Sequence, residues 1–324
     1  MNKKVKIFLA DDLHPAGINL LKKHFTLISL KGLDNNSLLH KIADYCSGAN
    51  TCSALLVRSV RKICKSELTF IKNNTSVNLI CTVSAGFDNL DIHQAEKLGI
   101  RIMNVAGANS ISAAEFTWAL ILAITKRLLK ADSLMKRGIY DYSKFANTEL
   151  NGKTIGIIGV GNIGSKVAKI AKAFGMKVLG NDIKPSLKNR YPFIKFVSLN
   201  KLLKMSDIVT IHTPLDDSTK YLLNNTNIKL MQKHSVLINC SRGGTIDEKA
   251  LQTALKRGRL SYAGVDVFEK EPAFNKTFSK LDNVILSPHL AGKTVESKER
   301  MARVAAEKII NFYKKSGKRA KLIN

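Results

Sequence analysis

Short apolar runs bounded by polar residues recur along the whole chain of 324 residues. Runs of this length, separated by segments with helical spacing, are typical of strands and helices that alternate around a parallel sheet. The runs that we predict as strands cover residues 5–10, 54–57, 79–83, 153–158, 177–180, 207–212, 235–239, 263–267 and 284–286. The pattern therefore predicts an α/β fold with parallel sheets.

Four segments have the spacing of helices. Residues 165–174 carry apolar side chains on one face and are followed by Gly175, a common helix stop. Residues 248–256 lie between two predicted strands, and residues 295–314 form one long amphipathic pattern. Residues 111–124 are mostly apolar but too short to span a bilayer, so we predict a buried helix there.

A glycine-rich turn joins the strand at 153–158 to the helix at 165–174, and it reads Gly159-Val160-Gly161-Asn162-Ile163-Gly164. In this setting the first glycine permits a tight turn, the second lets the backbone approach a pyrophosphate, and the third lets helix and strand pack closely. The helix start also offers unpaired N–H groups to the phosphates. We therefore predict that a dinucleotide contacts Gly159, Gly161, Asn162, Ile163 and Gly164. A glycine turn without a ligand is the alternative.

Asp182 comes directly after the strand at 177–180, where an acidic side chain accepts hydrogen bonds from the ribose hydroxyls of the adenosine. A carboxylate at this position repels a 2′-phosphate, so the sequence predicts NAD rather than NADP. Lys184 and Arg190 are close enough in the sequence to weaken this preference.

Length and charge add two expectations. A chain with 45% apolar residues can bury substantial cores, and its length favours about two domains. The formal net charge of +27 fits either nucleic-acid binding or attraction of anionic substrates. The basic residues are scattered, however, and only residues 314–319 form a cluster, without a recognition-helix motif. We expect no specific nucleic-acid partner and interpret the charge as a compositional bias.

We expect a cytoplasmic protein without a signal peptide, membrane segment or metal site. The apolar run at 5–10 is interrupted by Lys6 and stopped by Asp11 and Asp12. The five cysteines show no paired ligand spacing, and reduced thiols are typical of the cytoplasm.

Three side chains suited to catalysis follow neighbouring predicted strands. Arg242 comes after the strand at 235–239, Glu271 after the next, and His289 after the last. Ligands bind at the carboxyl ends of parallel strands. A guanidinium polarises a keto oxygen, a histidine donates a proton to the new alkoxide, and a carboxylate beside the imidazole favours its protonated form. These groups suit hydride transfer to a 2-keto acid.

Each candidate has a structural alternative. His289 could be a histidine packed between domains, and Arg242 could cap a strand end or pair with an acid. Glu269 competes with Glu271 as the partner of the histidine, and we favour Glu271 because it directly precedes Pro272.

With these residues in place, the chain resembles the D-isomer-specific 2-hydroxyacid dehydrogenases over nearly its whole length. The matching pieces are residues 84–91, 109–115, 159–164 with Asp182, 239–244, 266–272 and 287–292. The resemblance implies two Rossmann-like or flavodoxin-like α/β domains separated by a hinged cleft. The substrate-binding domain comprises residues 1–104 and 289–324, and the NAD-binding Rossmann domain comprises residues 105–288. It also implies a homodimer formed through the NAD-binding domains.

The resemblance assigns roles. Arg242 binds substrate and polarises its carbonyl, His289 is the general acid and base, and Glu271 is its carboxylate partner. Asp266 contacts the nicotinamide carboxamide. The residues that line the cofactor groove are Thr213, Cys240, Ser241 and Gly292, whereas His212 is a structural histidine. We interpret Cys240 as a packing residue rather than a nucleophile.

The resemblance also places the substrate carboxylate or its distal group against backbone N–H groups of Ser84, Ala85 and Gly86, with Arg58 and Ser59 nearby. The substrate is a small 2-keto or 2-hydroxy acid. Residues 109–115 and the basic surface resemble phosphoglycerate dehydrogenases, whereas residues 81–91 equally resemble glyoxylate and hydroxypyruvate reductases.

Two features weigh against a standard phosphoglycerate dehydrogenase. Thr82 stands where some of those enzymes have an arginine, and the chain ends soon after its last helix, without room for a regulatory domain.

A third alternative is an NAD-dependent corepressor-like binding protein, because those relatives keep the same arginine, glutamate and histidine. The absence of long polar tails speaks against it.

Overall fold

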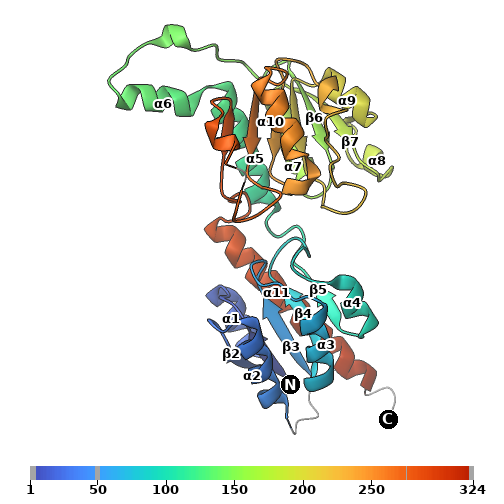
Figure 1. The fold of residues 1–324 in the computed structure, drawn as a ribbon. Coiled ribbons are helices and arrows are strands. Elements are labelled where there is room, and N and C mark those ends of the chain that lie inside the picture. The colour runs from blue at the N-terminus through green and yellow to red at the C-terminus, as the bar shows by residue number, and fades with distance from the viewer. Residues whose placement is uncertain (1–4, 48–51, 275, 321–324) are drawn as a thin grey trace. The chain divides into compact units, whose positions relative to one another are not determined.

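A computed structural model describes residues 5–47, 52–274 and 276–320, apart from the side chains of residues 144 and 316–320 (Figure 1). The chain divides into two compact units, one of residues 1–109 and 295–324 and one of residues 110–294. Both boundaries lie a few residues beyond the predicted ones. His289 and Gly292 consequently belong to the second unit, together with Arg242 and Glu271, rather than to the first.

The first unit contains a parallel five-stranded sheet in the order β2-β1-β3-β4-β5. Its strands are β1 (Lys6–Leu9), β2 (Thr26–Ser29), β3 (Ser53–Val57), β4 (Val77–Thr82) and β5 (Arg101–Met103). Side chains alternate between two cores, so Phe8 packs with one set of helices and Ile7 with the other. The helices are α1 (Pro15–Lys22), α2 (Asn35–Cys46), α3 (Lys65–Asn74), α4 (Ile92–Lys97) and α11 (Val295–Ala320). Helices α1 and α11 cover one face, and α2, α3 and α4 cover the other.

The second unit contains a parallel seven-stranded sheet in the order β12-β11-β10-β9-β6-β7-β8. The strands are β6 (Thr154–Ile158), β7 (Lys177–Asn181), β8 (Lys195–Phe196), β9 (Ile208–Ile211), β10 (Val236–Asn239), β11 (Tyr262–Val265) and β12 (Val284–Leu286). The α-helices are α5 (Ser110–Thr125), α6 (Leu128–Lys136), α7 (Gly164–Ala173), α8 (Leu187–Arg190), α9 (Leu199–Met205) and α10 (Glu248–Lys256). Short 3₁₀ turns are η1 (Tyr142–Lys144), η2 (Ile228–Leu230), η3 (Gly243–Thr245) and η4 (Phe278–Lys280).

The predicted fold class of two α/β domains with parallel sheets is confirmed, and the predicted buried helix is α5, with Trp118 and Ile121 in its core. Each sheet has one point at which the strand order reverses. This point lies between β1 and β3 in the first unit and between β6 and β9 in the second. Ligands of such folds bind beyond the carboxyl ends of the strands at this point.

Among the described residues, no helix combines the length and the apolar content needed to cross a lipid bilayer.

Candidate functional site

The glycine loop follows β6 at the switch point of the second sheet, and two of its glycines are required by space. Gly159 has a φ of +85°, and a Cβ there would lie 2.9 Å from the carbonyl carbon of His212, which follows β9. A Cβ on Gly164 would lie 2.1 Å from the carbonyl oxygen of Gly159. Because no side chain fits at either position, the start of α7 packs directly against the turn.

The middle of the loop is open instead of crowded. A Cβ on Gly161 would meet no atom within 4 Å, and Gly161 and Asn162 are exposed. The N–H groups of Gly161, Asn162 and Ile163 have no acceptor within the described part of the chain. Unpaired N–H groups at the start of a helix are the donors that a pyrophosphate needs. The loop thus has the geometry and the donors of a dinucleotide site, and contact with the cofactor remains a prediction.

Two buried polar atoms without partners lie across the switch point from the glycine loop. They are Nδ1 of His212 and Oγ1 of Thr213, and neither has a hydrogen-bond partner among the described residues. The methyl carbon of Thr213 would lie 3.0 Å from a Cβ on Gly159, so the threonine borders the loop. Buried polar atoms normally have partners, which indicates that a ligand completes this region. Together with the open Gly161, these atoms fit a bound NAD.

His212 has the properties of a structural histidine. Its Nε2 lies 3.0 Å from Oγ1 of Thr210, and burial lowers its pKa to about 3. The ring is therefore neutral at pH 7, as suits a structural histidine.

The buried ring predicts a pH-dependent stability of the second unit. The unfolded chain protonates His212 near pH 6.5, whereas the folded chain keeps it neutral until about pH 3. Its contribution to stability is thus complete above pH 6.5 and declines as the pH falls towards 3, by up to about 1.4 kcal/mol per pH unit. We expect His212→Gln to remove this slope. Urea unfolding between pH 7.5 and 5, followed by the fluorescence of Trp118, measures it because Trp118 is the only tryptophan and is buried in this unit.

The matched control is His93→Gln, because His93 is exposed and lies in the first unit. An equal slope for wild type and His212→Gln would contradict the burial argument.

Asp182 anchors the glycine loop to the end of β7. One carboxylate oxygen accepts the N–H of Val160 at 2.7 Å, and the other accepts the N–H of Lys184 at 2.9 Å. Each oxygen retains a second lone pair, which suits the ribose hydroxyls of the proposed cofactor. Arg190 is the other nearby cation, and Cζ of its guanidinium lies 5.5 Å from the centre of the Tyr191 ring.

We expect Asp182→Ala to lower the preference for NADH over NADPH by roughly 10- to 100-fold, because it removes a charged hydrogen-bond acceptor and the repulsion of a 2′-phosphate. The ratio of kcat/KM for the two cofactors measures the effect. Asp182→Asn is the matched control, since it keeps an acceptor and loses only the charge. An unchanged ratio in both variants would remove Asp182 from the ribose site.

Arg242 lies at the carboxyl edge of the same sheet, directly after β10. The carbonyl oxygen of Arg242 accepts hydrogen bonds from Nδ2 of Asn239 at 2.9 Å and from Oγ1 of Thr245 at 2.6 Å. A Cβ on Gly243 would lie 2.0 Å from the carbonyl carbon of Phe268, which shows that this loop packs tightly on the loop after β11. The backbone of the arginine is therefore fixed relative to the loop that carries Glu271.

Glu271 and His289 form a direct pair. Nδ1 of His289 lies 2.8 Å from Oε2 of Glu271, and both side chains are partly exposed, at 40% and 36%. Oε1 of Glu271 accepts the N–H of Phe268 at 3.0 Å. Burial opposes ionisation, but hydrogen bonds from His289 and Phe268, with the charges of His289 and Lys293, lower the pKa of Glu271. The carboxylate thus orients the ring through Nδ1 and leaves Nε2, which has no described partner, to exchange a proton.

The loop of His289 is organised by Asp266, which is completely buried. The carboxylate of Asp266 accepts hydrogen bonds from Oγ of Ser287 at 2.6 Å and from the N–H groups of Leu290 and Ala291 at 2.8 Å each. His289 has a φ of +54°, and its N–H donates to the carbonyl oxygen of Asp266 at 2.8 Å. Asp266 therefore fixes the backbone of the histidine, while its contact with nicotinamide remains a prediction.

Glu269 is engaged elsewhere. It accepts the N–H of Glu248 at 3.0 Å, and Glu248 accepts the N–H of Glu269 at 2.7 Å. Burial and the charge of Glu269 raise the pKa of Glu248, although the N–H of Glu269 lowers it. This reciprocal pair ties the start of α10 to the loop of Glu271, and the sequence gives no signal for it beyond two acidic residues at suitable positions. The structure therefore pairs His289 with Glu271 rather than with Glu269.

The other residues predicted to line the cofactor groove are buried or partly buried. Cys240 is buried, and burial together with the charge of Asp266 raises the pKa of its thiol to about 12, as suits a packing residue. The N–H and the hydroxyl of Ser241 both donate to Oδ1 of Asn239, at 3.0 and 2.8 Å. Gly292 is partly buried in the loop of His289. In residues 5–47, 52–274 and 276–320, no three His, Cys, Asp or Glu side chains are placed to hold a metal ion.

In the first unit, the loop after β4 presents amide donors in the way the sequence suggests. Its carbonyl oxygens are all occupied: Val105 donates to Ser84, Nδ2 of Asn104 donates to Ala85, and Oγ of Ser84 donates to Gly86. The N–H groups of Ser84, Ala85 and Gly86, by contrast, have no acceptor within the described residues. Successive free N–H groups form a concave site for an anion such as a carboxylate.

Arg58 and Ser59 follow β3, beside β4 in the sheet. Arg58 is partly buried, and its guanidinium has no partner among the residues that the structure describes, whereas Ser59 is exposed. A guanidinium without an internal partner is available to an anionic ligand.

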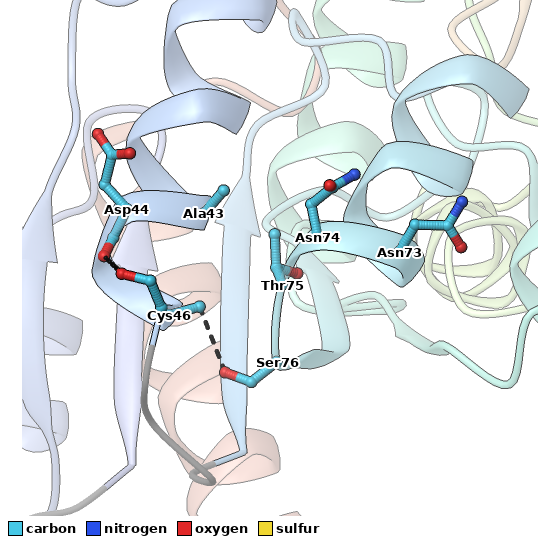
Figure 2. Close-up of a pocket in the computed structure, with 8 residues that line it drawn as sticks. Ala43, Asp44, Cys46, Asn73, Asn74, Thr75 and Ser76 are labelled. Carbon is cyan, nitrogen blue, oxygen red and sulfur yellow. Dashed lines mark hydrogen bonds between the residues drawn. The ribbon is translucent and has the colours of Figure 1, made fainter.

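A separate pocket of about 470 Å³ lies at the opposite edge of this sheet, between the last turns of α2 and α3 (Figure 2). Oγ of Ser76 donates to Sγ of Cys46 there at 3.3 Å. Because β4 begins beside this pocket and ends at the Ser84 loop, the pocket takes no part in the candidate site.

Comparison with known proteins agrees with this geometry. Residues 118–291 match the NAD binding domain of the D-isomer specific 2-hydroxyacid dehydrogenases. The D-3-phosphoglycerate dehydrogenase of Methanocaldococcus jannaschii is 38% identical over 94% of this chain, which spans only 57% of that relative's length. The glyoxylate reductase of Thermococcus litoralis is 34% identical over 96% of this chain and 94% of its own.

Among solved structures, an acyclic imino acid reductase in complex with NADPH and D-Arg superposes with a TM-score of 0.84. It is 28% identical, and the match covers 96% of this chain and 97% of that one. The chain belongs to the D-isomer specific 2-hydroxyacid dehydrogenase family.

Proposed function

We propose that this protein is an NAD-dependent oxidoreductase that interconverts a small 2-keto acid and its D-2-hydroxy acid. The observation that carries the proposal is the 2.8 Å pair of His289 and Glu271, held beside the loop of Arg242 at the edge where a parallel sheet binds its ligands. Family membership and the NAD binding domain at residues 118–291 support it.

Each side chain has one task in the proposed reduction. The glycine loop and Asp182 would hold NAD, which in its reduced form would supply a hydride for the keto carbon. The guanidinium of Arg242 polarises the carbonyl and stabilises the negative charge that develops on its oxygen. His289 donates a proton to that oxygen from Nε2, and Glu271 stabilises the charged ring through Nδ1. The N–H groups of Ser84, Ala85 and Gly86 hold the carboxylate of the substrate.

For the substrate, we propose a phosphoglycerate dehydrogenase-like specificity, with 3-phosphohydroxypyruvate as the keto acid. The unpartnered guanidinium of Arg58 supports an additional anionic group on the substrate. Glyoxylate or hydroxypyruvate is the second candidate, because Thr82 is buried and bonds Ser84 where an arginine would favour phosphate.

A steady-state screen tests the proposal. The purified protein is assayed with glyoxylate, pyruvate, hydroxypyruvate and 3-phosphohydroxypyruvate, each with NADH and with NADPH. We expect turnover with NADH and the highest kcat/KM for the phosphorylated acid. Binding of NADH without reduction of any of these acids would contradict an enzyme and favour an NAD-dependent binding protein.

We further propose a homodimer formed through the second unit. The α6 helix has no buried residue among its positions and exposes Leu128, Leu129 and Met135, each at 55% or more. The segment after it exposes Tyr140 at 83% and Tyr142 at 84%. Several large apolar side chains exposed in one segment are typical of an interface. Light scattering after gel filtration measures the mass, and a monomer at micromolar concentration would contradict the dimer.

The five cysteines are free in the structure, which supports our proposal that the protein acts in the reducing cytoplasm.

A further inference from the structure

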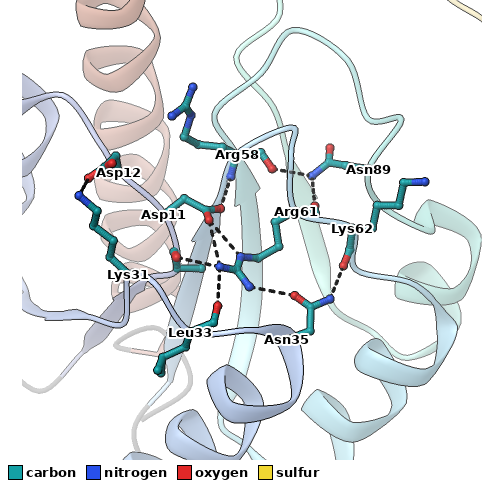
Figure 3. Close-up of polar contacts among 10 residues, drawn as sticks. Asp11, Asp12, Lys31, Leu33, Asn35, Arg58, Arg61, Lys62 and Asn89 are labelled. Atoms are coloured by element: carbon teal, nitrogen blue, oxygen red, sulfur yellow. Dashed lines mark hydrogen bonds and ion pairs between the residues drawn. The ribbon is translucent and has the colours of Figure 1, made fainter. Parts of the chain in front are cut away.

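The switch point of the first sheet is occupied by a side chain of the protein itself. The loops after β1 and β3 meet there, and the guanidinium of Arg61 lies between them (Figure 3). In folds with this strand order, the same place commonly holds a ligand. Arg61 is only 11% exposed, so its charge is almost completely removed from water.

Arg61 is held on every side by acceptors from the loops around it. Its Nε and Nη2 each lie 3.1 Å from Oδ1 of Asp11, which is 14% exposed. Nη2 also donates to the carbonyl oxygens of Ala10 at 3.1 Å and Leu33 at 3.0 Å. Nη1 donates to Oδ1 of Asn35 at 2.9 Å. This set of bonds joins the loops after β1 and β2 to the loop after β3.

The same carboxylate fixes the backbone of Arg58. Oδ2 of Asp11 accepts the N–H of Arg58 at 2.8 Å, so one aspartate holds both arginines of the loop. From the other side, Nδ2 of Asn89 donates to the carbonyl oxygens of Arg58 at 3.1 Å and Arg61 at 2.9 Å. Asn89 is 5% exposed. The loop is therefore fixed at both ends, while the Arg58 side chain points away from this network in Figure 3.

Asn89 also connects this loop to the proposed carboxylate site. Oγ1 of Thr82 lies 3.3 Å from Oδ1 of Asn89 and 2.8 Å from Oγ of Ser84, and its single proton is donated to one of these two atoms at a time. Ser84 in turn donates to the carbonyl oxygen of Gly86 at 2.8 Å. One continuous chain of buried or half-buried polar groups thus runs from the Arg58 backbone to the free N–H groups after β4.

We propose that Asp11, Arg61 and Asn89 are positioning residues that set the place of the Arg58 guanidinium relative to the Ser84–Gly86 loop and thereby determine selectivity for a 2-keto acid with a second anionic group. The inference rests on the proposed function. Arg61 itself is largely withdrawn from substrate, because its side chain is 11% exposed and Nε, Nη1 and Nη2 each donate to Asp11, Asn35 or backbone carbonyls. Arg61 therefore acts by holding the loop in place and not by contact with the substrate.

The test compares Arg61→Met and Asn89→Ala with Arg58→Ala, which removes the proposed ligand itself. Lys62→Ala is the matched control, because Lys62 is an exposed cation on the same loop and, among the residues that the structure describes, only its backbone carbonyl is bonded, by Nδ2 of Asn35. Two quantities are measured. One is the ratio of kcat/KM for 3-phosphohydroxypyruvate to that for hydroxypyruvate, and the other is hydrogen exchange of the peptide that covers residues 55–63.

We expect Arg58→Ala, Arg61→Met and Asn89→Ala to lower the selectivity ratio about tenfold or more, because KM rises further for the phosphorylated acid than for hydroxypyruvate. Exchange should rise in the Arg61 and Asn89 variants only. Lys62→Ala should match the wild type in both measurements.

Equal losses for both acids in the Arg61 and Asn89 variants, without a change of ratio, would show a merely structural role and overturn the inference. Unchanged exchange in both variants would also overturn it. If the wild type reduces none of the keto acids, the proposed function fails, whereas exchange still decides whether these residues fix the loop.

Discussion

Replacing His289 with alanine is expected to lower kcat by about 10²- to 10⁴-fold while leaving the affinity for NADH nearly unchanged. The ring is the group placed to give a proton to the developing alkoxide, since Glu271 occupies Nδ1 and Nε2 has no described partner. In the described part of the chain the ring bonds Glu271, whereas Asp182 bonds Val160 and Lys184, so cofactor binding should persist. Turnover at saturating substrate and titration of NADH fluorescence measure the two quantities separately.

His234→Ala is the matched control. His234 also pairs with a carboxylate, at 3.0 Å from Asp207, but it is 62% exposed and follows no strand end of the candidate site. We expect normal turnover in this variant. Loss of NADH binding or of the folded state in His289→Ala would show that the ring is structural, because its loop is tied to the buried Asp266.

The kcat of Glu271→Gln should lie between those of His289→Ala and His234→Ala, because glutamine can still accept a hydrogen bond but does not favour the imidazolium. The hydrogen bonds that lower the pKa of Glu271 keep it ionised near neutral pH. Its support of the ring is therefore lost only as the pH falls through that lowered pKa.

The central strands could be predicted from the sequence because they are buried on both faces. β3, β9 and β10 are buried at every position, which gives mainly apolar runs with one polar residue each. The strands that the sequence did not predict, β2, β5 and β8, lie at or near the edges of their sheets and are partly exposed. Their mixed composition resembles that of loops, and tertiary pairing alone makes them strands.

The chemically active residues of the candidate site could also be predicted from the sequence, because Arg242, Glu271 and His289 follow predicted strands and parallel strands end at one edge. The contacts that support these residues could not be predicted. The Glu248–Glu269 pair, the contact of Gly243 with Phe268 and the bonds of Arg61 all join segments distant in the sequence. Glutamate and arginine are common at protein surfaces, so only the folded backbone shows which of them are buried and paired.

The domain boundary near residue 289 could not be predicted for the same reason. The sequence suggests that the chain returns to the first domain at His289. However, the N–H groups of Leu290 and Ala291 donate to Asp266, and the hydroxyl of Ser112 donates to the carbonyl oxygen of Ala291 at 2.7 Å. These bonds keep the histidine with the second unit until α11 begins at Val295.

Replacing Arg242 with lysine is expected to lower kcat/KM by about 10²- to 10³-fold, although the positive charge is kept. A guanidinium presents several N–H donors in a planar fork that can bind a carboxylate and a keto oxygen together, whereas an ammonium is a point charge with freely rotating donors. The backbone of Arg242 should be unaffected, because Asn239 and Thr245 hold its carbonyl oxygen and Gly243 packs on Phe268 whatever side chain precedes it. Steady-state kinetics with the preferred keto acid measures the loss.

The fork itself can be isolated by chemical rescue of Arg242→Ala. Guanidinium ions at millimolar concentration should restore part of the turnover, and ammonium ions at the same concentration should restore less, because only the former reproduces two parallel hydrogen bonds. Arg257→Lys is the control for non-specific effects, since Arg257 is exposed at the end of α10. Near-normal activity of Arg242→Lys, or equal rescue by both ions, would show that Arg242 contributes charge alone, and the carbonyl would then have to be polarised mainly by the protonated ring of His289.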